Sequence, residues 1–183
     1  MAKVIIDITL VMSELIYDVQ NKTYLTGRSR GDSKTYERVA SMQSNDDDEN
    51  MNEILRSFGN AWSHMKLKLS EYLVEDGSSS NNVLLDGEEN ISIRLSMPSN
   101  FDKQMKDSIA GVLHQYLVNY TIGDWFTITN KDDAATYIQL ATENIDQLRE
   151  ALYKRVRPER KSHSSYEARA VETAADPENC NCL

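Results

Sequence analysis

Hydrophobic and polar positions follow two different periods along this chain, and the periods predict which elements form. From Thr9 onwards the apolar residues recur at helical spacing, which predicts a first helix that ends near the polar sequence LTGRSRGDS. The preceding VIID is interpreted as either a short strand or an extended arm. The apolar positions of this first helix are Val11, Met12, Leu15, Ile16 and Val19.

The second predicted helix has the clearest period of 3.6 residues in the sequence. Residues 27–50 before it are polar and are predicted to form a loop, whose acidic end SNDDDEN suits the positive end of the helix that follows. The turn sequence EDGSSSNN is predicted to end this helix. Its apolar stripe is Met51, Ile54, Leu55, Phe58, Trp62, Met65, Leu69, Tyr72 and Leu73.

A strict alternation over residues 91–97 predicts one strand of a β-hairpin that spans residues 83–97 and has one buried face. An Asp-Gly pair occupies the predicted turn of this hairpin. The apolar residues of the alternation are Ile91, Ile93, Leu95 and Met97, and the polar residues between them are Ser92, Arg94 and Ser96.

Two more helices are predicted after Pro98. The third is capped by Ser99 or Asn100 and ends near Tyr120, where a break at TIGDWFTITNKDD is expected. The fourth runs from about Asp132 to Arg155. The apolar positions of the third helix are Phe101, Met105, Ile109, Val112, Leu113, Tyr116, Leu117 and Tyr120. The inward positions of the fourth helix are Ala134, Ile138, Ala141, Ile145, Leu148 and Leu152.

These elements predict a mainly α fold: a four-helix bundle-like domain with one β-hairpin insertion and a long extended C-terminal tail. The helical domain is expected to span residues 1–155, and residues 156–183 are expected to form an extended C-terminal arm that lacks helical periodicity after Pro158. Trp62 and Trp125 are expected to lie in the core or at an elbow of the chain.

Charge and composition narrow the functional classes. The formal net charge of −9 argues against non-specific binding of nucleic acid by the whole surface. Asp7 and Glu14 interrupt the apolar N-terminal run, so neither a signal peptide nor a membrane span is expected. Both cysteines, Cys180 and Cys182, lie in the last four residues, which predicts no disulfide framework and a chain of cytosolic origin.

No motif predicts catalysis, a cofactor or a metal. The sequence has no HExxH, no phosphate-binding loop and no GxSxG, and its three histidines are spread over two predicted helices and the arm. The acidic run Asp46–Glu49 lacks the alternate spacing and the central glycine of a calcium loop. The terminal CNCL fits a prenylation box, but an acidic sequence stands where a basic run usually accompanies a lipid anchor. We therefore expect a protein that is not an enzyme.

A basic cluster around the end of the fourth predicted helix is the most informative charged feature. Cations near a helix C-terminus complement the helix dipole, but this explanation does not cover the charges beyond Pro158. The cluster would contact either phosphates or an acidic protein surface, and docking on protein is preferred because aromatic residues are not interleaved with the cations. The candidate partner-binding residues are Arg155, Arg157, Arg160, Lys161, Tyr166 and Arg169.

Two segments resemble head-to-tail connector proteins of tailed phages, including those of crAss-like phages. They are ITLVMSELIYDVQNKTYLTGRSR and YLVNYTIGDWFTITNKDDAATYIQLATENIDQLREALYKRVRPERKS. The shared pattern is a helix ending near Tyr120, a Trp-containing elbow at Asp124-Trp125 and a helix rich in small residues, followed by the basic exit Arg155–Lys161. The loop at 27–50 and the hairpin do not match this pattern.

The resemblance implies a structural virion protein of the neck, assembled in the host cytoplasm. It implies a homo-oligomeric, twelve-fold ring beneath the portal protein, in contact with other connector or tail proteins, with DNA passing through the channel without sequence-specific binding. The C-terminal arm would dock on the portal or on a neighbouring subunit. A soluble helical binding module, such as an assembly chaperone or a host-directed effector, is the alternative interpretation.

Overall fold

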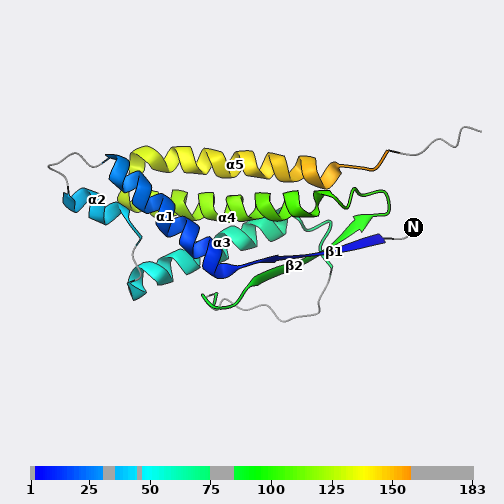
Figure 1. Cartoon of the computed structure of the whole chain (residues 1–183), viewed down its shortest axis with the longest axis horizontal. Coiled ribbons are helices and arrows are strands. Elements are labelled where there is room, and N and C mark those ends of the chain that lie inside the picture. The colour runs from blue at the N-terminus through cyan, green and yellow to red at the C-terminus, as the bar shows by residue number, and fades with distance from the viewer. Residues whose placement is uncertain (1–2, 31–35, 45–46, 75–84, 158–183) are drawn as a thin grey trace, which may run out of the picture.

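The computed structural model describes residues 3–30, 36–44, 47–74 and 85–157, which form five helices and one two-stranded antiparallel sheet (Figure 1). The prediction of a mainly helical fold is confirmed. Its four long predicted helices correspond to α1, α3, α4 and α5. The elements in chain order are β1 (Lys3–Leu10), α1 (Met12–Arg30), α2 (Tyr36–Met42), α3 (Asp48–Lys68), β2 (Ile91–Pro98), α4 (Met105–Thr129) and α5 (Lys131–Tyr153).

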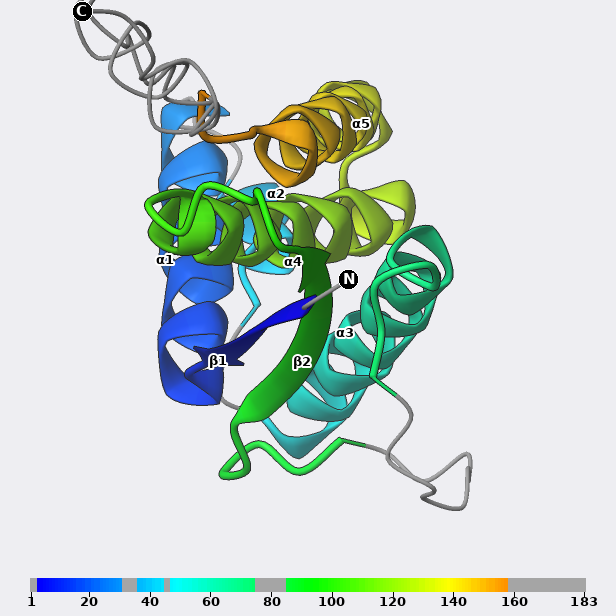
Figure 2. The same ribbon diagram turned by 90° about the vertical axis from the view of Figure 1, so that its right-hand side faces the viewer.

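Helix α4 lies at the centre of the molecule. It contacts α1, α2, α3, α5 and β1, and Figure 2 shows it between α5 on one side and the sheet and α3 on the other. A helix that is covered on most sides is apolar around most of its circumference, and α4 follows this rule. Its buried residues are Ile109, Leu113, Tyr116, Leu117, Val118, Asn119, Thr121, Ile122, Gly123 and Phe126.

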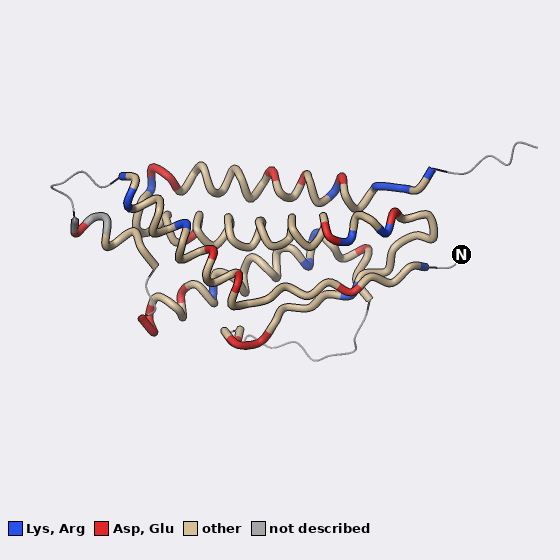
Figure 3. Tube along the Cα trace, viewed as in Figure 1, with Lys and Arg blue, Asp and Glu red and all other residues tan. Residues whose placement is uncertain are grey.

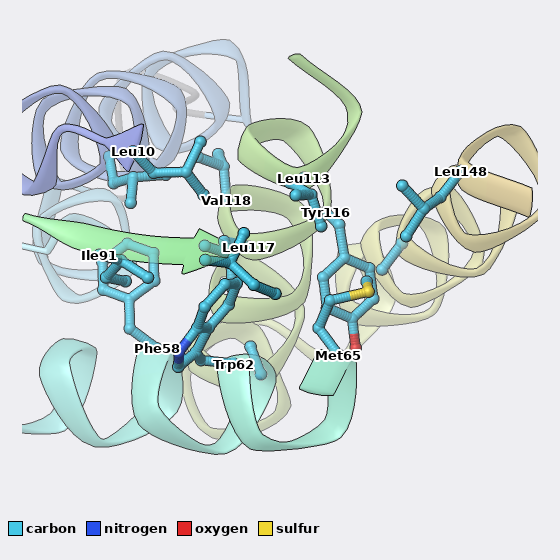
Figure 4. Packing of buried hydrophobic residues seen from close by; sticks show 14 of the residues in the cluster. Leu10, Phe58, Trp62, Met65, Ile91, Leu113, Tyr116, Leu117, Val118 and Leu148 are labelled. Carbon is cyan, nitrogen blue, oxygen red and sulfur yellow. The ribbon is translucent and has the colours of Figure 1, made fainter. Parts of the chain in front are cut away.

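The core is formed by large side chains from α3, α4 and the sheet. Phe58 and Trp62 of α3 lie against Leu117 of α4, with Ile91 of β2 beside them (Figure 4). Trp62 is buried as the sequence predicts. Burying side chains of this size contributes about 1.5–3 kcal/mol each, so this cluster is the main source of stability in the domain.

The strand at residues 91–98 is confirmed, but the predicted partner was wrong. β2 pairs with β1 in an antiparallel register that places Ile6 opposite Leu95, so VIID belongs to a strand and residues 85–90 do not. Both strands bury every second residue, as an antiparallel sheet with one covered face does. The Asp-Gly pair that suggested a local hairpin turn, Asp86 and Gly87, lies in an irregular segment.

The break predicted within TIGDWFTITNKDD is present at Asn130, but the predicted helix end near Tyr120 was wrong, because α4 continues through Trp125 to Thr129 before α5 begins at Lys131. β-branched residues and Gly123 lower the helix propensity here, but burial of Ile122 and Phe126 overrides it. Gly123 permits the close approach of α5, since a Cβ atom at this position would lie 3.0 Å from Cγ1 of Ile138. Trp125 lies within a helix and not at an elbow, and it is half-buried against the core, which agrees with the other predicted alternative.

Residues 27–50 are not one continuous loop. Helix α1 extends to Arg30, and the short helix α2 follows within this segment. The indole Nε1–H of Trp125 donates a hydrogen bond to the carbonyl oxygen of Met42 at 3.0 Å and so joins the end of α2 to α4. The expected acidic start of the next helix is confirmed by Asp48 and Glu49 in the first turn of α3.

Helix α5 packs on α4 and ends at Tyr153. Most of its predicted inward positions are buried, and Ala134 and Ala141 provide the small side chains at the contact. Ile138 differs from the prediction, because its side chain is 48% exposed at the margin of the helix pair. Residues 158–183, which make up most of the predicted C-terminal arm, lie outside the described residues.

Candidate docking surface

The chain that leaves α5 is tied to the segment that leads into α4. The main-chain N–H of Val156 donates to the carbonyl oxygen of Asn100 at 2.9 Å, and the N–H of Asp102 donates to the carbonyl oxygen of Lys154 at 3.4 Å. Phe101, between these two bonds, is 2% exposed and anchors the pairing in the core. The start of the C-terminal arm therefore has a defined position at one end of the helical domain.

Arg155 helps to end α5. Its Nη1 donates to the carbonyl oxygen of Leu152 at 2.6 Å and to that of Lys154 at 3.0 Å, which satisfies acceptors that a helix C-terminus leaves open. Burial raises the pKa of the nearby Tyr72 hydroxyl, its hydrogen bond and proximity to Tyr153 raise it further, and Arg155 acts in the opposite direction. Tyr72 lies just after α3 and Tyr153 is the last residue of α5, so the hydrogen bond between these two tyrosines joins the ends of the two helices.

Five cations gather at this end of the molecule, and we call them the basic end: Lys103, Lys106, Lys154, Arg155 and Arg157. All are exposed except Arg155, which is half-buried. Figure 3 shows the cationic positions of the segment after α5 at the same end as those at the start of α4. The carboxylates beside these cations are Asp102 and Asp107, which flank the two lysines, and Glu71 next to Tyr72, so the five cations still give the basic end a net positive charge in a chain of formal net charge −9.

The two lysines at the start of α4 oppose the helix dipole. The N-terminus of a helix carries partial positive charge, and cations there are unfavourable by a few tenths of a kcal/mol to about 1 kcal/mol. Lys103 and Lys106 therefore do not stabilise α4 locally, whereas Lys154 and Arg155 at the end of α5 do. Their position is better explained by an electrostatic role of the surface than by helix stability.

The structure brings two of the sequence-predicted binding residues to this surface. Arg155 and Arg157 lie in the basic end, where Arg155 also has the structural role described above. The other four candidates, Arg160, Lys161, Tyr166 and Arg169, lie outside the described residues. Sequence reasoning missed Lys103 and Lys106, although two lysines at the start of a helix would have indicated that their charge serves something other than the helix.

A groove lies between α1, α4 and α5, away from the basic end. This groove has a volume of about 470 Å³ and is lined by Lys22, Leu25, Thr26, Gln115, Asn119, Tyr137 and Leu140. Burial lowers the pKa of Lys22, and the Asp18 carboxylate acts in the opposite direction. The Lys22 ammonium donates to Oε1 of Gln115 at 3.1 Å, and the hydroxyl groups of Thr26 and Tyr137 lie 3.0 Å apart. These polar groups therefore already have protein partners: the Lys22–Gln115 bond joins α1 to α4, and the Thr26–Tyr137 bond joins α1 to α5.

The two described histidines also have protein partners. Nε2 of His114 lies 2.9 Å from Oδ2 of Asp18, and Nδ1 of His64 lies 2.7 Å from the hydroxyl of Tyr116. Burial raises the pKa of that Tyr116 hydroxyl to about 12. In the described ranges, no group of three or more His, Cys, Asp and Glu residues is placed to hold a metal ion. Within the same ranges, no helix combines the length and the apolar character needed to cross a bilayer.

Comparisons with protein-family models, with curated protein sequences and with solved structures found no significant match to this chain.

Proposed function

We propose that this protein is a structural subunit of the head-to-tail connector of a tailed phage, and that its basic end docks on an acidic surface of a neighbouring protein. The observation that carries the docking proposal is the convergence of two separate segments, residues 103–106 and 154–157, into one exposed basic surface. The resemblance of the sequence to connector proteins supplies the identity of the assembly.

The fixed position of the arm supports a docking role for this end. Two main-chain hydrogen bonds hold residues 154–156 against residues 100–102, so whatever the following residues bind is brought next to the basic end. In the sequence, two more cations, Arg160 and Lys161, follow Arg157 closely and increase the positive charge at the start of the arm. An arm with few large apolar residues cannot form a core of its own and becomes ordered on the surface of a partner. Charge complementarity increases the rate and the specificity of such an encounter.

In this proposal the subunits form a closed ring in the virion neck and contact the portal protein and other connector or tail proteins. Contacts between different surfaces of identical subunits close into rings when the rotation permits it. The protein is structural rather than enzymatic and needs no cofactor. The whole chain has a formal net charge of −9, so the surface outside the basic end is acidic, which suits both an acidic neighbour of the same kind and a channel through which DNA slides.

The test is the mass of the assemblies that the purified full-length chain forms, alone and with a candidate portal protein. We expect the wild-type chain to form a ring or to bind the portal, and we expect Lys103→Glu/Arg157→Glu to weaken this assembly at least tenfold. Assembly should also weaken as salt is raised, because exposed charges are screened.

Arg56→Glu is the matched control, since Arg56 is an exposed arginine in α3 outside the basic end. It should assemble as the wild type does, and all variants should keep the wild-type melting temperature within the few degrees that surface substitutions allow. Assembly that is unaffected by the double variant would refute docking through the basic end. Binding of duplex DNA in place of the portal would favour phosphate recognition, and a monomer that binds neither would favour a soluble binding module of another kind.

A further inference from the structure

The two strands of the sheet differ in how their edges are covered. β2 has main-chain partners on both sides: β1 on one edge, and on the other edge residues 72–74, where Ser96 N–H donates to Tyr72 O at 2.6 Å and Val74 N–H donates to Arg94 O at 3.2 Å. The sheet has the order β1–β2, so in the described part of the chain no strand lies along the other edge of β1. β1 is therefore an edge strand of eight residues.

The hydrogen-bonding groups along that edge follow from the pairing. In a strand, the main-chain groups of successive residues point to opposite edges. Arg94 and Ser96 use theirs toward residues 72–74, so their neighbours in β2 point toward β1, where the even-numbered residues receive them. The N–H and C=O groups of the odd-numbered residues of β1 consequently point away from the sheet. These residues are Lys3, Ile5, Asp7 and Thr9.

The same four residues place their side chains on the exposed face of the sheet. Ile5 is 59% exposed, between Lys3 and Asp7, both of which are exposed as well. Native edge strands are commonly protected by a proline, a bulge, a short length or charged side chains, because an unprotected edge pairs with other strands. β1 pairs with β2 without interruption over eight residues and contains no proline. This edge therefore retains the geometry of a pairing surface.

The order of charged and apolar residues along β1 indicates which partner strand would complement it. An antiparallel partner that satisfies this edge needs an acidic residue opposite Lys3, an apolar residue opposite Ile5 and a basic residue opposite Asp7. Read in the partner's own direction, this sequence is basic, any residue, apolar, any residue, acidic. Lys3-Val4-Ile5-Ile6-Asp7 is such a sequence. The strand is its own complement.

We propose that two copies of this protein pair through the edges of β1, antiparallel about a two-fold axis at Ile5. Lys3 of each copy then faces Asp7 of the other, Ile5 faces its counterpart, and Val4 faces Ile6 on the buried side. The result is a four-stranded sheet in which the two β1 strands are central. Asp7 already accepts a hydrogen bond from Nε of Arg94 at 2.7 Å, so each carboxylate joins two cations in the dimer.

The position of α1 is compatible with this register. Figure 2 shows α1 leaving the C-terminal end of β1, so the half of the strand that contains Lys3 to Asp7 is the half farther from α1. The contact is isologous and closes at two copies. It uses a surface other than the basic end, and the two proposals are tested by different substitutions.

The test is a pair of charge-reversal variants, each of which should dimerise poorly alone, whereas a mixture of the two should form a heterodimer. Lys3→Glu places two acidic residues opposite each other at both ends of the contact, and Asp7→Lys places two lysines there. Each variant alone should weaken the dimer by about tenfold or more, because two attractive cross-strand pairs become repulsive. An equimolar mixture should restore the dimer as a heterodimer. In that heterodimer the introduced glutamate of one copy faces the introduced lysine of the other, and the unchanged Asp7 faces the unchanged Lys3.

The full-length chain is used throughout, with sedimentation equilibrium over a concentration series and circular dichroism to confirm that each variant is folded. The wild type should associate in a concentration-dependent way with the dimer as its smallest associated species, also where dimers assemble further into the ring proposed above. A wild-type chain that stays monomeric over the series would overturn the proposal. Variants that dimerise as well as the wild type would also overturn it, because the dimer would then use another surface, and so would a mixture that fails to associate.

Discussion

The two sides of α4 are packed by different means. Toward α3, large side chains fill the interface, with Phe58, Trp62 and Met65 lying against α4 (Figure 4). Toward α5, the backbones approach closely at Gly123, and a buried amide pair joins Asn119 to Asn144 at 2.9 Å. The α3 side depends mainly on apolar volume removed from water, with one polar contact between His64 and Tyr116, whereas the α5 side depends on close contact and on a buried amide pair.

Buried polar groups on these helices also differ in whether they have a partner. The hydroxyl groups of Ser57 in α3 and Thr121 in α4 are buried and have no hydrogen-bond partner, whereas the amides of Asn119 and Asn144 are paired. Removing a polar group should therefore have opposite effects in the two cases.

Phe58→Ala should lower the free energy of unfolding by about 3–5 kcal/mol, because it removes a ring that is fully buried and leaves a cavity. Urea denaturation of the purified chain measures the change. Leu67→Ala is the control on the same helix, since Leu67 is 73% exposed and should cost less than about 0.5 kcal/mol. Equal losses for the two variants would contradict the assignment of the core to this side of α4.

Asn144→Ala should lower the free energy of unfolding by about 1–3 kcal/mol, because it leaves the buried amide of Asn119 without its acceptor. A double-mutant cycle with Asn119→Ala isolates the interaction. We expect the double variant to be less destabilised than the sum of the single variants, since removing both amides leaves neither unpaired. Strict additivity would mean that the pair contributes nothing to the α4–α5 contact.

Thr121→Val should raise the free energy of unfolding by about 1 kcal/mol, because it replaces an unpaired buried hydroxyl with a methyl group of similar size. Thermal unfolding of the variant beside the wild type detects this gain as a higher melting temperature. A lower melting temperature would show that the hydroxyl has a partner in solution.

The sequence predicted the elements whose signal is local. The stripe of α3 and the alternation of β2 were identified because each is repeated within one segment of the chain. The partner of β2 was missed because β1 lies more than eighty residues earlier, and no local period records a non-local pairing. The Asp-Gly pair at Asp86 supported the wrong partner, since it favours a turn that the chain does not use here.

The continuation of α4 through Trp125 was missed for a related reason. Its helix propensity is low, and the burial that overrides this propensity becomes visible only when α5 and α2 are in place. Only the residues of the basic end that are close together in the sequence were predicted. Arg155 and Arg157 stand in an obvious run of charge, but Lys103 and Lys106 join them only because Val156 pairs with Asn100.

The pairing of Val156 with Asn100 also has a mechanical consequence. If a bound partner pulls on the C-terminal arm, the tension first reaches the two hydrogen bonds between residues 154–156 and 100–102. From there it passes to Phe101, which is held in the core, and to the first turn of α4 rather than to α5 alone. A load on the arm is therefore carried by the best-anchored helix of the domain, and α5 is protected from being peeled away from its end.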